Sequence, residues 1–89
     1  MKNNLTWENR YSKTDEPDKE GRWMSTCKFK NVSIGRVVLD PGFRYRAETY
    51  FPAHKGEIPL YNCTWSTPKQ ARESIEYYWE KFTRIITTD

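Results

Sequence analysis

The sequence predicts an α+β domain in which an antiparallel three- to four-stranded meander carries one long C-terminal helix, packed on one face. Three observations support this prediction: apolar and polar residues alternate from Arg22 onward, turn residues separate the alternating segments, and a helical apolar stripe follows them. The 89 residues suit one domain, and an aromatic content of 16% can close a small core. We therefore expect a single domain at residues 22–89, preceded by a flexible polar tail at residues 1–21.

The tail is predicted mainly from residues 12–21, SKTDEPDKEG, which include no apolar residue and end in a glycine. This composition is typical of a solvated loop, so we expect these ten residues to be mobile. Their acids lead directly into Arg22, and the tail could fold over a basic sheet and partly neutralise it. Leu5, Trp7 and Tyr11 precede the loop and could dock back on the domain.

Alternation predicts four strands, near residues 22–30, 33–39, 43–51 and 59–65. In the first strand, Trp23, Cys27 and Phe29 share one side. The tripeptide Asp40-Pro41-Gly42 has the residues of a tight hairpin turn. The third strand alternates most clearly, with Phe43, Tyr45, Ala47, Thr49 and Phe51 on one face and Arg44, Arg46, Glu48 and Tyr50 on the other. Short connections between these strands favour an antiparallel meander.

A helix is predicted near residues 67–86. Thr67 suits the N-cap, Pro68 suits the first helical position, and Gln70 completes a capping box. One stripe of this helix is apolar and contains Ala71, Ile75, Tyr78, Trp79, Phe82, Ile85 and Ile86. Tyr77 should lie at the flank of the stripe.

These patterns also predict burial. We expect Trp65, Trp79 and Phe82 to be among the most buried residues, because the helix must cover the apolar face of the sheet. Arg44, Arg46 and Glu76 should be exposed, since they lie on the opposite sides of their elements.

The second face of the sheet is left open by this arrangement, and the positive charge of the chain concentrates there. The net charge is +3, and the segment from Arg22 to Glu57 has seven basic and three acidic residues. Alternation and proximity place on this face the candidate nucleic-acid-binding residues Lys28, Lys30, Arg36, Arg44, Arg46 and Tyr50. Phosphate contacts and base stacking use such residues. An open sheet face is also polar in proteins that bind no nucleic acid, so another use or none stays open.

Residues suited to catalysis or cofactor binding are scarce. The one histidine, His54, lies in a loop bounded by prolines, where a solvent-exposed imidazole is expected. Cys27 and Cys63 have no second cysteine or histidine at metal-ligand spacing, so they are interpreted as reduced core thiols, with a disulfide as the alternative. We expect no catalytic residues, no metal and no cofactor.

No apolar run approaches the roughly 20 residues that cross a bilayer, and the first residues lack the apolar core of a secretory signal. The sequence therefore predicts a cytoplasmic protein without a membrane partner.

A resemblance adds to this interpretation. An aromatic strand reads FRYRA, a final strand ends in an aromatic before STPKQA, and an amphipathic helix runs to Phe82. With these features the span 34–82 resembles the DNA-binding modules made of a three-stranded sheet and a helix, such as the plant AP2/ERF domain and the N-terminal domains of tyrosine integrases. The resemblance implies that Trp65 packs under the helix, Thr67 caps it, and Ala71 lets it approach the sheet. It also implies DNA contacts by Arg36, Arg44 and Arg46 in the major groove.

The predicted function is therefore that of a non-enzymatic small binding protein that contacts nucleic acid through the basic open face of its sheet. The alternative is a protein partner. In size and aromatic content the chain resembles bacteriophage accessory proteins, many of which bind and inhibit a host protein in host takeover or counter-defence. Contacts would then involve Trp7, Tyr50 and Tyr77.

Overall fold

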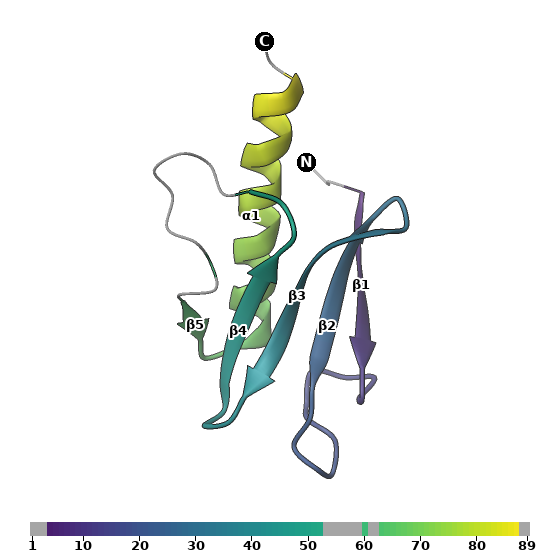
Figure 1. Ribbon diagram of the computed structural model, residues 1–89. Coiled ribbons are helices and arrows are strands. Elements are labelled where there is room, and N and C mark those ends of the chain that lie inside the picture. Colours follow the sequence, from purple (N-terminus) through teal and green to yellow (C-terminus); the bar gives the residue numbers. More distant parts are fainter. Residues whose placement is uncertain (1–3, 53–59, 61–62, 88–89) are drawn as a thin grey trace.

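The computed structural model describes residues 4–52, 60 and 63–87, and it has a five-stranded antiparallel sheet with one helix on one face (Figure 1). The strands and the helix are β1 (Leu5–Arg10), β2 (Met24–Phe29), β3 (Val32–Asp40), β4 (Arg44–Thr49), β5 (Thr64–Trp65) and α1 (Pro68–Thr87). The strands lie side by side in the order of the sequence. The predicted α+β meander with a C-terminal helix is thus confirmed, with five strands instead of three or four.

The additional strand is β1, which lies within the predicted tail. It pairs with β2 along its whole length, from Leu5 opposite Phe29 to Arg10 opposite Met24. Leu5 and Trp7 are half-buried and pack against the core. Two apolar residues give too short an alternation to predict a strand from the sequence. The strand is stabilised by its pairing with β2.

Two of the acids between β1 and β2, Asp15 and Asp18, have partners on α1 and within the loop. The Asp15 carboxylate accepts two hydrogen bonds from the guanidinium of Arg72 on α1, one of them at 3.0 Å. The Asp18 side chain accepts the backbone N–H groups of Glu20 at 3.0 Å and Arg22 at 2.8 Å. Asp15 and Asp18 are therefore satisfied by these partners, contrary to the expectation that they neutralise the sheet, whereas neutralisation by Glu16 and Glu20 stays a prediction.

Two tight turns set the pairing of the central strands. Lys30 and Asn31 connect β2 to β3 with φ values of 49° and 70°, as in a two-residue hairpin loop. The predicted turn at residues 40–42 is present, and the Phe43 N–H donates to the Asp40 carbonyl at 3.1 Å. Gly42 adopts φ of 94° in this turn, a value that favours glycine.

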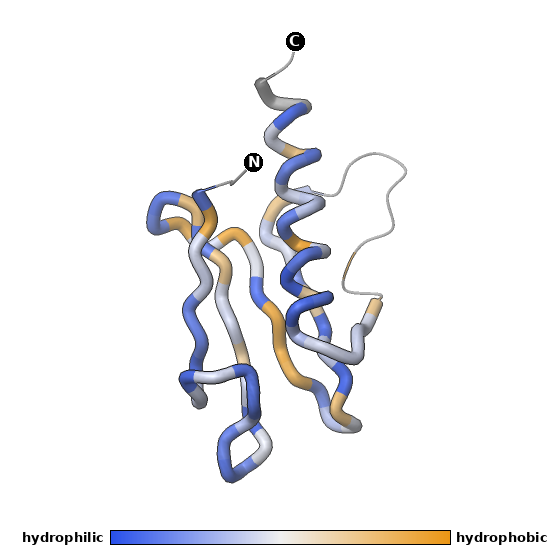
Figure 2. Tube along the Cα trace, turned by 180° about the vertical axis from the view of Figure 1, so that it is seen from behind, coloured by the Kyte–Doolittle hydropathy of each residue, from blue (hydrophilic) through white to orange (hydrophobic). Residues whose placement is uncertain are grey.

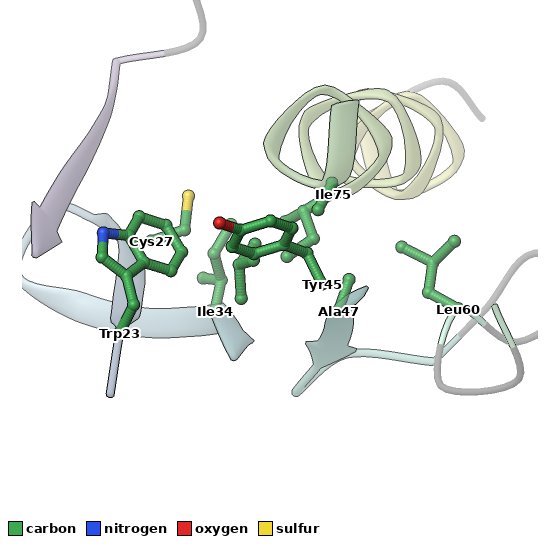
Figure 3. Packing of buried hydrophobic residues seen from close by; sticks show 9 residues of the cluster. Trp23, Cys27, Ile34, Tyr45, Ala47, Leu60 and Ile75 are labelled. Carbon is green, nitrogen blue, oxygen red and sulfur yellow. The ribbon is translucent and has the colours of Figure 1, made fainter. Parts of the chain in front are cut away.

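The core lies between the sheet and α1 (Figure 3). Its buried apolar residues are Trp23, Cys27, Ile34, Val37, Tyr45, Ala47, Leu60, Ala71 and Ile75. Ile75 reaches the sheet directly above Gly35 on β3. A Cβ at position 35 would lie 3.4 Å from Cγ2 of Ile75 and 2.7 Å from the Glu48 carbonyl oxygen. A Cβ would thus clash with the β4 backbone, and the bare backbone of Gly35 lies in contact with Ile75 of the helix.

The predicted helix phase is confirmed, because Ala71 and Ile75 are fully buried whereas Tyr77 is 52% exposed. The expectation that Trp65, Trp79 and Phe82 are the most buried residues was wrong, since all three are only half-buried. The rings of Trp79 and Phe82 pack on Phe51 at the border of the core, with centroids 5.1 and 5.2 Å away.

Exposure was also predicted for three charged residues. Arg44 is exposed as expected, whereas Arg46 and Glu76 are half-buried because each has a partner.

The helix covers only part of its side of the sheet. It lies mainly over β3, β4 and β5, and β1 and β2 stand beside it (Figure 2). Side chains close this second half. The Trp7 indole N–H donates to Glu76 of α1 at 2.9 Å, and the Arg72 guanidinium lies over the rings of Trp7 and Trp23, 5.8 and 5.4 Å from their centroids. The Nε atom of Arg72 is buried there without a hydrogen-bond partner.

Candidate functional site

In the described part of the chain, no helix packs on the face of the sheet turned away from α1, and we call this face the open face. Its side chains follow from strand alternation and from the pairing of the strands. The charged ones are five cations, Arg10, Lys28, Arg36, Arg44 and Arg46, and three acids, Glu8, Asp40 and Glu48. The open face therefore has a formal charge of 5 − 3 = +2 from these residues.

Four of these residues form a continuous ion-pair ladder across β3 and β4, made of Arg36, Glu48, Arg46 and Asp40. Arg36 lies directly opposite Glu48, and its Nε is 2.6 Å from a Glu48 carboxylate oxygen. The other Glu48 oxygen pairs with Arg46, whose Nε lies 3.0 Å from Asp40. Partial burial acts to raise the pKa of Glu48, but the hydrogen bonds from Arg36 and Arg46 outweigh it and hold this pKa below its ordinary value. Glu48 is therefore ionised at neutral pH.

A second ion pair joins β1 and β2. The Lys28 ammonium lies 3.1 Å from the Glu8 carboxylate on the neighbouring strand. Opposite charges on adjacent strands stabilise a sheet modestly when they are exposed to water. Three of the predicted phosphate-binding cations, Lys28, Arg36 and Arg46, thus already have acidic partners.

The remaining predicted residues differ from these three. Arg44 is exposed and donates to the side-chain and backbone oxygens of Thr64, both at 3.1 Å, rather than to an acid. Lys30 lies in the β2–β3 turn with its ammonium 5.3 Å from the Phe29 ring centroid. Tyr50 follows the end of β4 and is 53% exposed. The structure therefore brings Lys28, Arg36, Arg44 and Arg46 to one face and leaves Lys30 and Tyr50 at its margin.

The acidic partners Asp40 and Glu48 were missed by reasoning from alternation alone. Alternation gives the face of a side chain but not its neighbour across the strand pair. A signal was nevertheless present in the turn, because pairing Asp40 with Arg44 and counting outward along both strands places Arg36 opposite Glu48.

An exposed aromatic residue borders the ladder. Phe43 ends the β3–β4 turn, is 75% exposed and has φ of 63°, a conformation that costs a bulky residue energy. Beside it lies a hollow of about 330 Å³ between this turn and the loop before β2. The hollow is lined by Glu20, Gly21, Leu39, Asp40, Pro41, Gly42 and Phe43. Asp40 belongs to both the hollow and the ladder, so the two features form one surface.

The described residues include no group of three or more histidine, cysteine or acidic side chains that could hold a metal. His54 lies outside the residues that the structure describes. Both cysteines are free, and burial raises the pKa of the Cys27 thiol to about 12, with the charge of Glu76 adding to the effect. Where the structure describes the chain, it has no helix of the length and apolarity that a membrane span requires.

No protein-family model, no curated protein and no solved structure matches this chain.

Proposed function

We propose that this chain is a non-enzymatic binding protein that recognises a protein partner through the open face of its sheet. The observation that supports this proposal is the ion-pair ladder, in which cations and acids alternate across β3 and β4. A surface with both signs of charge complements another protein surface that presents both signs in the opposite arrangement. A host protein in the cytoplasm is the partner that this proposal envisages, with inhibition as the consequence of binding.

The ladder disfavours a polyanion as the ligand. A phosphate that approached Arg36 or Arg46 would meet the ionised carboxylate of Glu48 between them. Tight binding to nucleic acid depends on cations that release counterions from phosphates, and cations already paired with acids contribute less to that release. Of the four predicted cations that lie on the open face, Arg44 is the best placed to contact a phosphate, because its partner Thr64 is uncharged.

Phe43 supplies the apolar contact that a protein interface needs at its centre. Interfaces owe most of their affinity to a few large side chains that enter pockets of the partner. Phe43 is exposed and held in an unfavourable backbone conformation, and such strain in a native structure motivates a functional hypothesis. A partner that covers Phe43 and the ladder together would bury both features.

Nucleic acid stays as a second candidate because of two specific observations. The open face has five cations against three acids, and Arg44 has no acidic partner there. The resemblance of span 34–82 to sheet-plus-helix DNA-binding modules supports the same candidate. In this case Lys28, Lys30 and Tyr50 would add contacts at the margin.

One substitution separates the two candidates. Glu48→Gln removes the central acid of the ladder and releases Arg36 and Arg46. We would measure binding to three fluorescein-labelled ligands: a mixed-sequence DNA duplex, single-stranded DNA and RNA. The salt concentration would be varied about sixfold, from about 50 to about 300 mM. A nucleic-acid protein should bind more tightly after Glu48→Gln, and Arg44→Ala should reduce its salt slope by about one. A protein-binding module should bind these nucleic acids only weakly, both before and after each of the two substitutions.

A pull-down from lysate after nuclease treatment tests directly for a protein partner. A partner of the open face should be retained by the wild type, lost with Glu48→Gln or Phe43→Ala, and retained by the control Glu73→Gln, which alters an exposed acid on α1. Partners that survive both open-face substitutions, or that disappear with nuclease, would contradict the proposal.

A further inference from the structure

The two edges of the sheet differ in how they are protected. β5 is only two residues long, and α1 begins at Pro68 shortly after it. β1 lies at the other edge, beside β2 (Figure 1). It offers six residues in an unbroken register with β2 and contains no proline. Natural proteins usually shorten, bulge or cover an edge strand so that it does not pair with another chain. Among these devices, β1 has only its charged side chains Glu8 and Arg10.

The helix side of the same edge is incompletely covered. α1 lies mainly over β3, β4 and β5, and β1 is seen beside it with no helix in front (Figure 2). Leu5, Trp7 and Phe29 pack against the core there but remain partly exposed. A strand added next to β1 would satisfy its free backbone groups and cover the border of the core at once.

We propose that β1 pairs antiparallel with β1 of a second copy of this chain and extends the sheet across a twofold axis. Such an interface is self-complementary, since the same strand supplies both sides. Opposed residues in an antiparallel pair point to the same face. A shift of the pairing register by one residue would place Trp7 beside side chains of the partner's charged open face. This excludes registers that differ by one residue.

Charge then selects between the two registers that pair five residues of β1. One is centred on Glu8 and sets this acid directly opposite the partner's Glu8, which is destabilising. The other is centred on Trp7 and sets Thr6 opposite the partner's Glu8 and Leu5 opposite the partner's Asn9. It opposes no like charges, and it brings the two half-covered tryptophans together between the two helices. The dimer therefore has Trp7 at its centre.

Substitutions at Thr6 test this register. Thr6 is exposed on the open face, so changes there leave the core intact. Thr6→Lys should strengthen the dimer and Thr6→Glu should weaken it, because each copy places residue 6 opposite the partner's Glu8. The expected change in the dimer dissociation constant is roughly 2- to 30-fold in each direction, from two cross-strand pairs. Analytical ultracentrifugation of the full chain over a range of concentrations measures it.

The matched controls are Ser33→Lys and Ser33→Glu, which make the same charge changes at an exposed position of β3. They should leave the dissociation constant of the dimer unchanged. A wild-type chain that stays monomeric at roughly 1 mM, where even weak specific association is detectable, would overturn the proposal. Thr6 variants that shift association in the same direction, or no more than the Ser33 variants, would overturn it as well. Phe43→Ala and Glu48→Gln should leave the dimer intact. The dimer can therefore be tested independently of partner binding by the open face.

Discussion

The two halves of the sheet are closed by different physical means. Under α1, the strands β3, β4 and β5 meet the helix through close apolar contact, and Gly35 lets Ile75 approach the backbone. At β1 and β2, the side chain of Arg72 fills the space between the helix and the sheet. Its guanidinium lies over the rings of Trp7 and Trp23 and donates hydrogen bonds to Asp15. Apolar packing closes the first half, whereas in the second half the buried residues Trp23 and Cys27 are supplemented by the polar contacts of Arg72.

This difference decides how much stability each half contributes. Burial of apolar surface gives about 25 cal/mol per Å² and involves no titrating group, so it does not change with pH. An ion pair in contact with water contributes at most about 1 kcal/mol and weakens with salt. We therefore expect large effects from substitutions of buried apolar residues such as Ile75, and small, condition-dependent effects from substitutions of the polar contacts that Arg72 makes at β1 and β2.

The largest effect is expected from Ile75→Ala. Ile75 is fully buried between α1 and the sheet, so the substitution should lower the free energy of unfolding by about 2–5 kcal/mol. Urea unfolding followed by tryptophan fluorescence measures the change. The control Tyr77→Ala, on the exposed flank of the same helix, should stay within about 0.5 kcal/mol. Similar losses for both variants would mean that α1 is not packed through Ile75.

Gly35→Ala should destabilise the protein by about 1–3 kcal/mol, because the added methyl meets the Glu48 carbonyl oxygen at 2.7 Å and part of the fold must shift. The same unfolding measurement applies. Ser33→Ala, at an exposed position of the same strand, provides the matched control and should be nearly neutral. A neutral Gly35→Ala variant would show that the Glu48 carbonyl leaves room for a Cβ at position 35.

Asp15→Asn tests the half at β1 and β2. The hydrogen bond from Arg72 holds the pKa of Asp15 below its ordinary value, so the unfolded state binds a proton more readily than the folded state does. The stabilisation is therefore present above the unfolded pKa of roughly 4 and is lost as the pH falls through the lower folded pKa. Since Asp15 is about half exposed, we expect Asp15→Asn to cost no more than about 1 kcal/mol at pH 7.

Unfolding free energies of the wild type and Asp15→Asn at pH 7 and pH 3 measure this dependence. The two proteins should converge at low pH. A difference that stays constant between the two pH values would show that the Asp15–Arg72 pair contributes nothing through its charge.

The smallest expected effect is local opening of the β1–β2 half, which the reaction rates of the two thiols report. Cys27 is buried on β2 and its pKa is raised to about 12, whereas Cys63 is half-buried before β5. A thiol reagent at pH 8 should therefore modify Cys63 first, and Cys27 only when the β1–β2 half opens. Asp15→Asn should accelerate the Cys27 reaction specifically, as followed by mass spectrometry. Equal acceleration of both thiols would indicate global unfolding instead.

The fold could be predicted from the sequence because β2, β3 and β4 alternate clearly and α1 has strong boundary signals. The predicted cap is present, since Thr67 Oγ1 accepts the Gln70 N–H at 3.2 Å. β1 could not be predicted, because its stability comes from the pairing with β2 and from contacts with Glu76 and Arg72 that are distant in the sequence. Local propensity carries no information about such contacts.

The candidate site was predicted only in part for a related reason. Alternation assigned Arg44 and Arg46 to the open face, and Arg36 was added by proximity; burial of the opposite face agrees with these assignments. Whether these cations are paired depends on the strand register, which the turn at residues 40–42 fixes. The order of burial along α1 was predicted wrongly, because Ala71 and Ile75 are fully buried whereas Trp79 and Phe82 lie at the border of the core.

The unequal lengths of the connections between strands have a kinetic consequence. Residues 30–31 join β2 to β3 and residues 41–43 join β3 to β4, whereas residues 11–23 separate β1 from β2. A short loop closes at a smaller entropic cost, and hairpins form within microseconds. We therefore expect the β2–β3–β4 meander to assemble early in folding and β1 to add late. A strand that joins last is also the first to detach, and a newly made chain would pass through a four-stranded state with its β2 edge unpaired.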